Sequence, residues 1–198
     1  MFKYFLVYKP FGMLSQFTRE GDHPTLADLD FEFAKDIYPV GRLDADSEGL
    51  LLLTNDNFLK TKLLEPRNKH TRTYYVQVEG DITAEACEQL SRGVTISING
   101  KAYKTLPANA QLIEEPPLPE RNPPIRFRKN IPATWLALTL REGKNRQVRR
   151  MTAAVGFPTL RLARWSIGKF SLADKTGSFP KSGDVWEVTA SEARRFYE

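Results

Sequence analysis

Short runs of apolar residues recur along the chain, and most are rich in the β-branched and aromatic residues that favour extended backbone. They predict strands at residues 5–8, 50–53, 73–79, 135–140, 159–165 and 185–188. Residues 50–53 are all leucine, so this strand should be central and buried on both faces. Because the strands do not alternate regularly with helices, the pattern favours an α+β fold over a doubly wound parallel sheet.

Cap and turn residues between positions 83 and 104 predict one helix and one hairpin. Thr83 is suited to begin a helix and Gly93 to end it. Asn99 and Gly100 predict a two-residue hairpin turn, because both positions of a type I′ turn require a positive φ. Cys87 would lie on the helix as a small buried apolar residue, and we expect no chemical role for it.

A proline-rich segment at residues 115–132 contains 6 of the chain's 13 prolines, which predicts an extended loop in place of a helix or strand. The segment also carries Arg126 and Arg128. It is either a rigid connector or a basic arm that contacts phosphates, and the pattern leaves both interpretations open.

The composition is that of a folded, mildly basic protein. Of 198 residues, 41% are hydrophobic and 27% are charged, and the formal net charge of +5 favours an anionic partner without proving one. A single cysteine excludes an intramolecular disulfide, and with only two histidines beside it there is no set of soft ligands for a structural zinc. We therefore expect a reducing compartment and no bound metal.

The N-terminal residues are apolar but are interrupted by Lys3, Lys9 and Pro10. They do not form the continuous apolar stretch of a signal peptide or a membrane span. No later apolar run approaches the roughly 18 residues that a span requires. We expect a soluble, cytoplasmic protein.

Acidic residues at alternate positions precede the leucine run. They are Asp44, Asp46 and Glu48 in the segment GRLDADSEG, residues 41–49. The spacing resembles the start of a calcium-binding EF-hand loop, but the twelfth position is Asn55 in place of a bidentate Glu, and positions seven to ten are leucine. The segment is therefore either a carboxylate site for chemistry or a solvated turn whose acids cap the following elements.

A basic segment, REGKNRQVRR, occupies residues 141–150 and contains five basic residues and one acid. If Asn145 caps a helix that runs to about residue 155, one face of that helix is apolar. That face would consist of Val148, Met151, Thr152 and Val155. Such a one-sided concentration of positive charge favours contact with phosphates, although a merely solvated basic face is the alternative.

The arginines of this predicted helix would lie in different environments. Arg146 and Arg150 are one turn apart and would face RNA. Arg149 lies beside the apolar face, where a partly buried guanidinium needs a carboxylate partner.

The two charged segments, within GRLDADSEGLLLLTND and EGKNRQVRRM, resemble the paired signature of the RsuA-type bacterial ribosomal RNA pseudouridine synthases. Lys9-Pro10 with Gly12, and the strand that begins Arg72-Thr73-Tyr74, match further elements of that family. Within the family the chain is most similar to the E-type group, which modifies large-subunit (23S) ribosomal RNA, through YKPFGMLSQFT, RNPPIR and MTAAVGFPTLRL. Arg72 stands where lysine is common in the family, a change that keeps the charge but can alter hydrogen-bond geometry.

The resemblance implies the pseudouridine synthase fold, with a mixed, largely antiparallel central sheet flanked by helices and two subdomains around a catalytic cleft. It also implies that residues 1–198 form one catalytic domain. Many relatives carry an N-terminal S4-like RNA-binding domain, for which this sequence leaves no room. RNA capture would then fall to the surfaces of the catalytic domain itself.

The resemblance also implies roles for individual residues. Asp44 would be the catalytic carboxylate, Arg149 the guanidinium that pairs with it, and Tyr74 the ring that stacks on the target uracil. The expected RNA contacts are Arg42, Lys9, Arg72, Arg126, Arg128, Lys144, Asn145, Arg146, Gln147 and Arg150. We expect no metal and no organic cofactor. The expected partner is ribosomal RNA of the large subunit, free or in an assembly intermediate, with no membrane, no obligate protein partner and a monomeric chain.

Pseudouridine formation breaks the N1–C1′ glycosidic bond of uridine and joins C5 to C1′. Asp44 would either attack C1′ or remove a sugar proton to give a glycal, and the sequence leaves both routes open. Two other functions compete. A non-catalytic RNA-binding or ribosome-assembly protein would use the same basic surface, and a glycoside hydrolase would draw a carboxylate pair from Asp44, Asp46 and Glu48.

Overall fold

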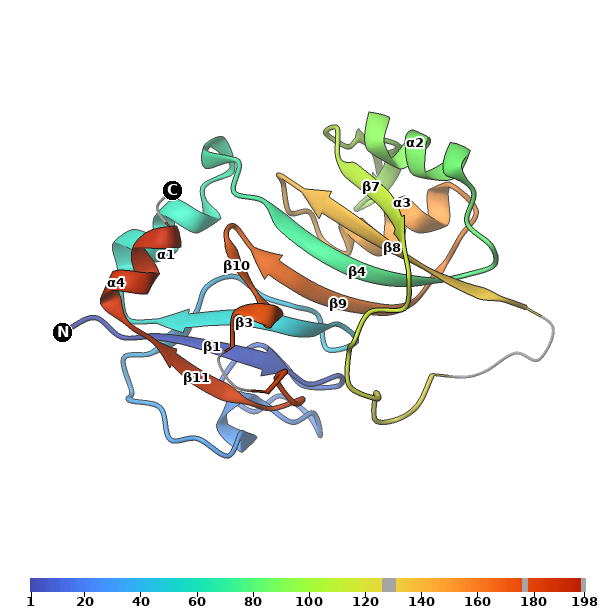
Figure 1. The fold of residues 1–198 in the computed structure, drawn as a ribbon. Helices are drawn as coiled ribbons and strands as arrows, with labels where there is room; N and C mark the ends of the chain where they lie inside the picture. Colours follow the sequence, from blue (N-terminus) through green and yellow to red (C-terminus); the bar gives the residue numbers. More distant parts are fainter. Residues whose placement is uncertain (126–130, 176–177, 197–198) are drawn as a thin grey trace. The chain divides into compact units, whose positions relative to one another are not determined.

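The computed structural model describes residues 1–125, 131–175 and 178–196, and the chain divides into two compact units (Figure 1). The first unit combines Met1–His70 with Arg164–Glu198, and the second is Thr71–Ala163. The boundary between them falls within β9 (Thr159–Ile167). No helix in the described ranges is long and apolar enough to cross a membrane.

The first unit is built on a sheet in which β1 and β3 are neighbouring interior strands. Its elements are β1 (Tyr4–Lys9), β2 (Tyr38–Pro39), β3 (Glu48–Thr54), α1 (Asn57–Leu64), β10 (Phe170–Ser171), β11 (Val185–Val188) and α4 (Ala190–Ala193). Strand β1 is antiparallel to both β3 and β11, β2 pairs with β3, and β10 pairs with the end of β9. All residues of β1 and β3 are buried, which confirms the buried central strand predicted from the leucine run.

One face of β1 and β3 is covered by the segment that follows β1. Phe5 and Val7 of β1 share a hydrophobic cluster with Met13 and Leu26 of that segment. The ring of Phe5 also makes edge contacts with aromatic rings of the same segment, those of Phe31 and Phe33, a geometry that adds to simple burial of apolar area. Because side chains alternate along a strand, Lys9 belongs to the same face as Phe5 and Val7.

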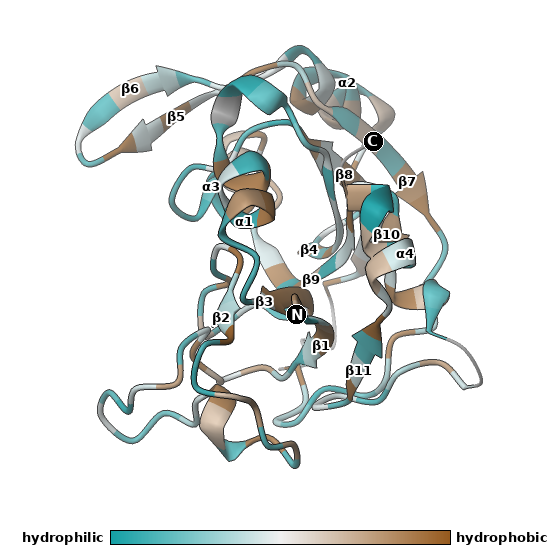
Figure 2. Cartoon of the chain, turned by 90° about the vertical axis from the view of Figure 1, so that its left-hand side faces the viewer, coloured by the Kyte–Doolittle hydropathy of each residue, from teal (hydrophilic) through white to brown (hydrophobic). Residues whose placement is uncertain are grey.

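The second unit contains a second set of antiparallel strands. Its elements are β4 (Arg72–Glu79), α2 (Ala84–Arg92), β5 (Thr95–Ile98), β6 (Lys101–Lys104), β7 (Asn109–Ile113), β8 (Ala133–Leu140) and α3 (Gln147–Ala154). Strand β8 lies between β4 and β7 and is antiparallel to both. Strands β5 and β6 form the predicted hairpin, whose polar colours along β6 are visible in Figure 2, with positive φ at Asn99 and Gly100.

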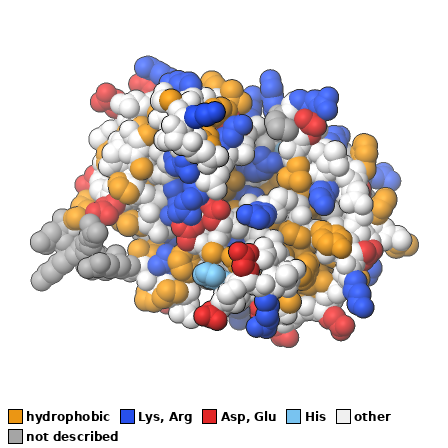
Figure 3. Space-filling model, turned by 180° about the vertical axis from the view of Figure 1, so that it is seen from behind, with side chains coloured by type: hydrophobic (Ala, Val, Ile, Leu, Met, Phe, Trp, Pro, Cys, Tyr) orange, Lys and Arg blue, Asp and Glu red, His pale blue; other side chains and the backbone are white. Residues whose placement is uncertain are grey.

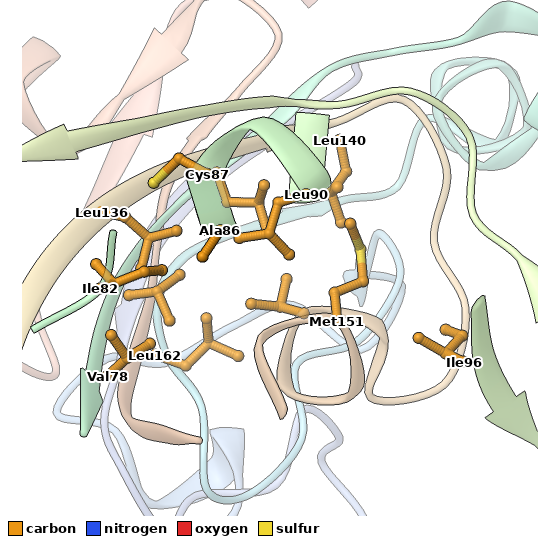
Figure 4. Close-up of a cluster of buried hydrophobic side chains, with 13 residues drawn as sticks. Val78, Ile82, Ala86, Cys87, Leu90, Ile96, Leu136, Leu140, Met151 and Leu162 are labelled. Carbon is orange, nitrogen blue, oxygen red and sulfur yellow. The ribbon is translucent and has the colours of Figure 1, made fainter. Parts of the chain in front are cut away.

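Helices α2 and α3 bury their apolar faces against β4 and β8. Figure 4 shows Cys87 and Leu90 of α2 and Met151 of α3 converging on strand residues that include Leu136. Thr83 caps α2 through its side chain, as predicted, and Cys87 is a buried core residue. Burial raises the pKa of the Cys87 thiol, which disfavours the nucleophilic thiolate.

The expected strands and the α+β class are confirmed, whereas the expected start of α3 is wrong. Arg146, not Asn145, occupies the N-cap, in the left-handed conformation with φ of 51° and without a side-chain cap. Helix α1 and strand β7 were not predicted. Asp56 carries the overlooked signal for α1, since its side chain accepts a hydrogen bond from the backbone N–H of Leu59. Strand β7 is mostly exposed and mixes polar with apolar residues, so it lacks the pattern of a core strand.

Candidate active site

The loop that carries Asp44 is a tight turn between buried residues. The backbone N–H of Ser47 donates to the carbonyl of Asp44 at 3.0 Å, which closes the turn. Leu43 and Ser47 are 7% and 1% exposed, whereas Asp44 is half-buried. The loop therefore fixes its backbone at both ends and leaves Asp44 only half-buried.

A buried lysine lies next to this loop. Lys9 is 0% exposed, and its Nζ donates to the carbonyls of Pro10 at 2.8 Å and Met13 at 2.6 Å. A side chain in this position does not reach RNA phosphates at the surface. The expected contact between Lys9 and RNA is therefore corrected. The Lys9 ammonium instead binds backbone carbonyls of the segment that follows β1.

Burial lowers the pKa of Lys9 from 10.5 to about 7. The carboxylates of Glu48, Asp46 and Asp44 oppose this shift, and the guanidinium of Arg164 adds to it. Glu48 is itself buried and accepts a hydrogen bond from the hydroxyl of Tyr8 at 3.4 Å. The acidic loop thus supplies the negative charge that a buried ammonium needs, and Glu48 belongs to this supporting structure.

Stability should rise with pH because of Lys9. Below pH 7 the lysine is charged in both states and its burial costs stability; between about pH 7 and 10.5 only the unfolded chain binds the proton, so folding becomes more favourable. We expect wild type to gain about 1.4 kcal/mol per pH unit between pH 7.5 and 9 relative to Lys9→Met. Urea unfolding of both proteins across this range measures the difference, and parallel stability curves would contradict the lowered pKa of buried Lys9.

Arg164 is a second buried cation that sequence reasoning missed. It is 3% exposed, and its Nε donates to the carbonyl of Leu50 at 2.7 Å, which joins the end of β9 to the start of β3. The backbone of Arg164 also lies so close to Gly49 that a Cβ there would be 2.4 Å from its carbonyl oxygen. The glycine at position 49 was the sequence signal for this close contact. Its φ is +103° and no side chain fits beside the Arg164 backbone, so the position requires glycine.

In the second unit, residues 141–146 form a turn between β8 and α3 that we name the basic turn. Glu142, its one acid, is 7% exposed and points inward. Its carboxylate accepts hydrogen bonds from the Tyr103 hydroxyl at 2.5 Å, the Leu106 N–H at 2.8 Å and the Gln147 amide at 2.7 Å. The Tyr103 hydroxyl, held by Glu142, has its pKa raised. Glu142 therefore anchors the turn from inside, a role that sequence reasoning did not assign.

The outward residues of the basic turn are exposed cations. Lys144 and Arg146 are exposed, and the Lys144 Nζ lies 5.0 Å from the centre of the Tyr103 ring, within range of a cation–π contact. The expected contact between Gln147 and RNA is also corrected, because Gln147 is buried and its amide donates to Glu142. Asn145 is exposed, and its side-chain oxygen accepts a hydrogen bond from the Arg150 guanidinium at 3.0 Å.

The arginines of α3 are more constrained than predicted. Arg150 is half-buried and also donates to the carbonyl of Ser97 in the β5–β6 hairpin, so part of its donor capacity is used within the fold. Arg149 is half-buried, as expected, and its Nη1 donates to the carbonyl of Thr159 at 3.5 Å.

Strand β4 brings two further expected residues into this unit. Arg72 lies opposite Leu140, directly before the basic turn, and a Cβ on Gly143 would lie 3.9 Å from its Nη1. Tyr74 lies opposite Leu138, and its half-buried ring packs against the core formed with Val76. Arg72 therefore extends the basic turn, and Tyr74 has one side of its ring supported by the core.

The expected site residues fall in both units. Asp44 and the exposed Arg42 belong to the first unit, whereas Arg149 and Tyr74 belong to the second, so their pairing and stacking roles stay predictions. Arg126 and Arg128 lie outside the described residues. In the described part of the chain, no group of three or more His, Cys, Asp and Glu side chains is arranged to hold a metal ion. Figure 3 shows many Lys and Arg side chains on one face, with carboxylates scattered among them.

Comparison with known proteins finds relatives of a single kind. A family model described as RNA pseudouridylate synthase matches residues 3–154. The chain is 54% identical over 172 residues to the ribosomal large subunit pseudouridine synthase E of Vibrio vulnificus, covering 87% of this chain and 71% of that protein. It is 48% identical to the protein of the same name from Xanthomonas campestris, covering 85% and 88%. A solved structure titled pseudouridylate synthase is similar with a TM-score of 0.78 and 26% identity, covering 99% and 74%.

Proposed function

The chain belongs to the RNA pseudouridylate synthase family, and from this premise we propose that it isomerises a specific uridine of large-subunit ribosomal RNA to pseudouridine. The observation that carries the proposal is the GRLDADSEG loop, which holds Asp44 half-buried on a fixed backbone beside buried charges. The names of the relatives support the substrate class, since they refer to the large ribosomal subunit. Those relatives are bacterial, and this supports a cytoplasmic reaction.

In the proposed reaction the N1–C1′ bond breaks, the detached uracil turns within the site, and C5 bonds to C1′. The proton of C5 is lost to solvent and N1 takes up a proton, so the product is an isomer of the substrate. Asp44 acts either by attacking C1′ or by removing a sugar proton to give a glycal. We propose, from the family resemblance, that Arg149 serves as the guanidinium partner of Asp44 in the reaction. No atom is gained or lost by the nucleotide, so the reaction needs no external oxidant or reductant.

The target uridine must leave its stack in the RNA before it reaches Asp44. Unstacking costs on the order of a few kcal/mol, which stacking on an aromatic ring and contacts with phosphates offset. Tyr74 is the proposed stacking residue, because the core behind it limits its movement. The proposed RNA contacts in the described chain are Arg42, Arg72, Lys144, Asn145, Arg146 and Arg150.

The direct test is release of tritium from ribosomal RNA labelled at uracil C5, because that hydrogen leaves only when C5 becomes the glycosidic atom. We expect release from large-subunit RNA, free or in immature particles, approaching one equivalent per molecule, and none from small-subunit RNA. Binding of large-subunit RNA without any release would favour the alternative, a non-catalytic RNA-binding or assembly factor. Release from small-subunit RNA alone would keep the reaction and overturn the substrate.

The basic turn should contribute to RNA affinity through its exposed charges. Arg146→Gln is expected to weaken binding several-fold and to reduce the slope of log affinity against log salt by about 0.7 to 0.9, the value for one phosphate contact. Arg92→Gln is the matched control, because Arg92 is also an exposed arginine of the second unit but lies at the end of α2, outside the basic turn. Filter binding at several salt concentrations compares the two variants. Equal slopes for both would remove Arg146 from the RNA contacts.

A further inference from the structure

The segment after β1 is hydrogen-bonded to the Asp44 loop on both sides of Asp44. We name this segment, residues 10–15, the clasp. The backbone N–H of Gly12 donates to the carbonyl of Ala45 at 2.7 Å. The hydroxyl of Ser15 donates to the carbonyl of Leu43 at 2.9 Å and accepts from the N–H of the same residue at 3.0 Å. The residues directly before and after Asp44 are therefore both bonded to the clasp.

The clasp is itself fixed to the body of the first unit. The Lys9 ammonium holds its Pro10 and Met13 carbonyls, and the Met13 side chain is buried in the cluster with Phe5 and Val7. The N–H of Leu14 donates to the carbonyl of Pro24 at 2.8 Å. Movement of the clasp would break these contacts together, so it provides a rigid reference for the loop.

We propose that Ser15 is a positioning residue that sets the orientation of the Asp44 carboxylate in the proposed reaction. Ser15 is 5% exposed, and one hydroxyl serves both backbone groups of Leu43. Leu43 precedes Asp44, so the plane of its peptide bond directs where the carboxylate points. A misplacement of about 1 Å at a reacting group can cost about 100-fold in rate, which makes the two hydrogen bonds at this position consequential for turnover.

This inference rests on the proposed function and predicts a loss in turnover that simple destabilisation does not give. Ser15→Ala should lower kcat by about 10- to 100-fold and leave KM for RNA within about threefold, because Ser15 is buried and does not touch substrate. Ser15→Thr keeps a hydroxyl at the same position and should recover at least about fivefold of the lost kcat. If Ser15→Ala does not fold, Ser15→Cys replaces it with the same expected pattern.

Thr54 offers a matched control in the same unit. Its hydroxyl also donates to a backbone carbonyl, that of Lys3 at 2.6 Å, and accepts from a backbone N–H, that of Asp56 at 3.0 Å. Thr54 is 2% exposed and lies at the end of β3 remote from Asp44, about 20 Å along the strand from Glu48. Thr54→Val removes the same kind of hydrogen bonds and should keep kcat within about twofold of wild type.

The decisive measurement is kcat and KM from tritium release for wild type and the variants, each at a temperature where circular dichroism shows it folded. A kcat of Ser15→Ala equal to that of Thr54→Val, a loss confined to KM, or a Ser15→Thr variant as slow as Ser15→Ala would overturn the positioning role. A wild type that releases no tritium from any ribosomal RNA would instead overturn the proposed function. An active wild type with an equally active Ser15→Ala overturns only the role of Ser15.

Discussion

Replacing Asp44 by Asn should reduce pseudouridine formation by about 1,000-fold or more while leaving RNA affinity within a few fold of wild type. Both routes open to the reaction require a carboxylate at this position, to form a bond with C1′ or to accept a sugar proton, and an amide does neither. A loss of this size corresponds to about 4 kcal/mol of transition-state stabilisation. The partly accessible position of Asp44 predicts little effect on folding.

Asp46→Asn is the matched control for this prediction. Asp46 is also half-buried, lies two residues away in the same loop, and changes its charge by the same amount. We expect it to keep kcat within about tenfold, because its carboxylate contributes to the local field around Lys9 without taking part in the chemistry. Tritium release and RNA binding by both variants separate the roles. Similar losses in both would show that the loop acts through its total charge, and an active Asp44→Asn would remove Asp44 from the centre of the reaction.

Local pattern predicted those parts of the fold whose conformation depends on near neighbours in the sequence. The leucine run identified β3, because four consecutive leucines fit a short strand that is buried on both faces. Asn99 and Gly100 identified the β5–β6 turn through their tolerance of positive φ. Thr83 and Gly93 marked the ends of α2 in the same way. Each of these signals lies within a few residues of the structure that it determines.

The sequence did not reveal the roles of residues whose contacts are with distant parts of the chain. Lys9 has the composition of an RNA contact, but its burial depends on backbone carbonyls that close over it and on the Asp44 loop about 40 residues away. Glu142 stood out only as an acid among cations, yet it anchors the basic turn through Tyr103 of another strand. Ser15 lies within YKPFGMLSQFT, but no role was predicted for it from the sequence, because its hydrogen bonds are to Leu43, 28 residues away. The family signature predicted a role for Asp44, and the structure shows which residues hold its loop.

Gly49→Ala should destabilise the protein by at least about 3 kcal/mol, the largest effect on stability that we expect from adding one methyl group. The new Cβ would lie 2.4 Å from the carbonyl oxygen and 2.6 Å from the amide nitrogen of Arg164, and both are backbone atoms that cannot rotate away. The backbone at Gly49 also has φ of +103°, which alanine adopts only with strain. Relief requires β3 to move from Arg164, which would weaken the hydrogen bond from Arg164 to Leu50.

Gly100→Ala isolates the backbone strain from the collision. Gly100 has a positive φ of 77° in the β5–β6 turn, but nothing lies within 4 Å of an added Cβ, so we expect a cost of only about 1 to 2 kcal/mol. Urea unfolding gives the loss in free energy of unfolding for each variant relative to wild type. The extra loss in Gly49→Ala over that in Gly100→Ala measures the cost of the collision between the added Cβ and the Arg164 backbone. Because Gly49 ends the segment that carries Asp44, a Gly49→Ala protein that still folds should also lose turnover, whereas Gly100→Ala should keep it. Equal stability losses in the two variants would show that β3 has room to adjust, and that this contact does not fix the loop.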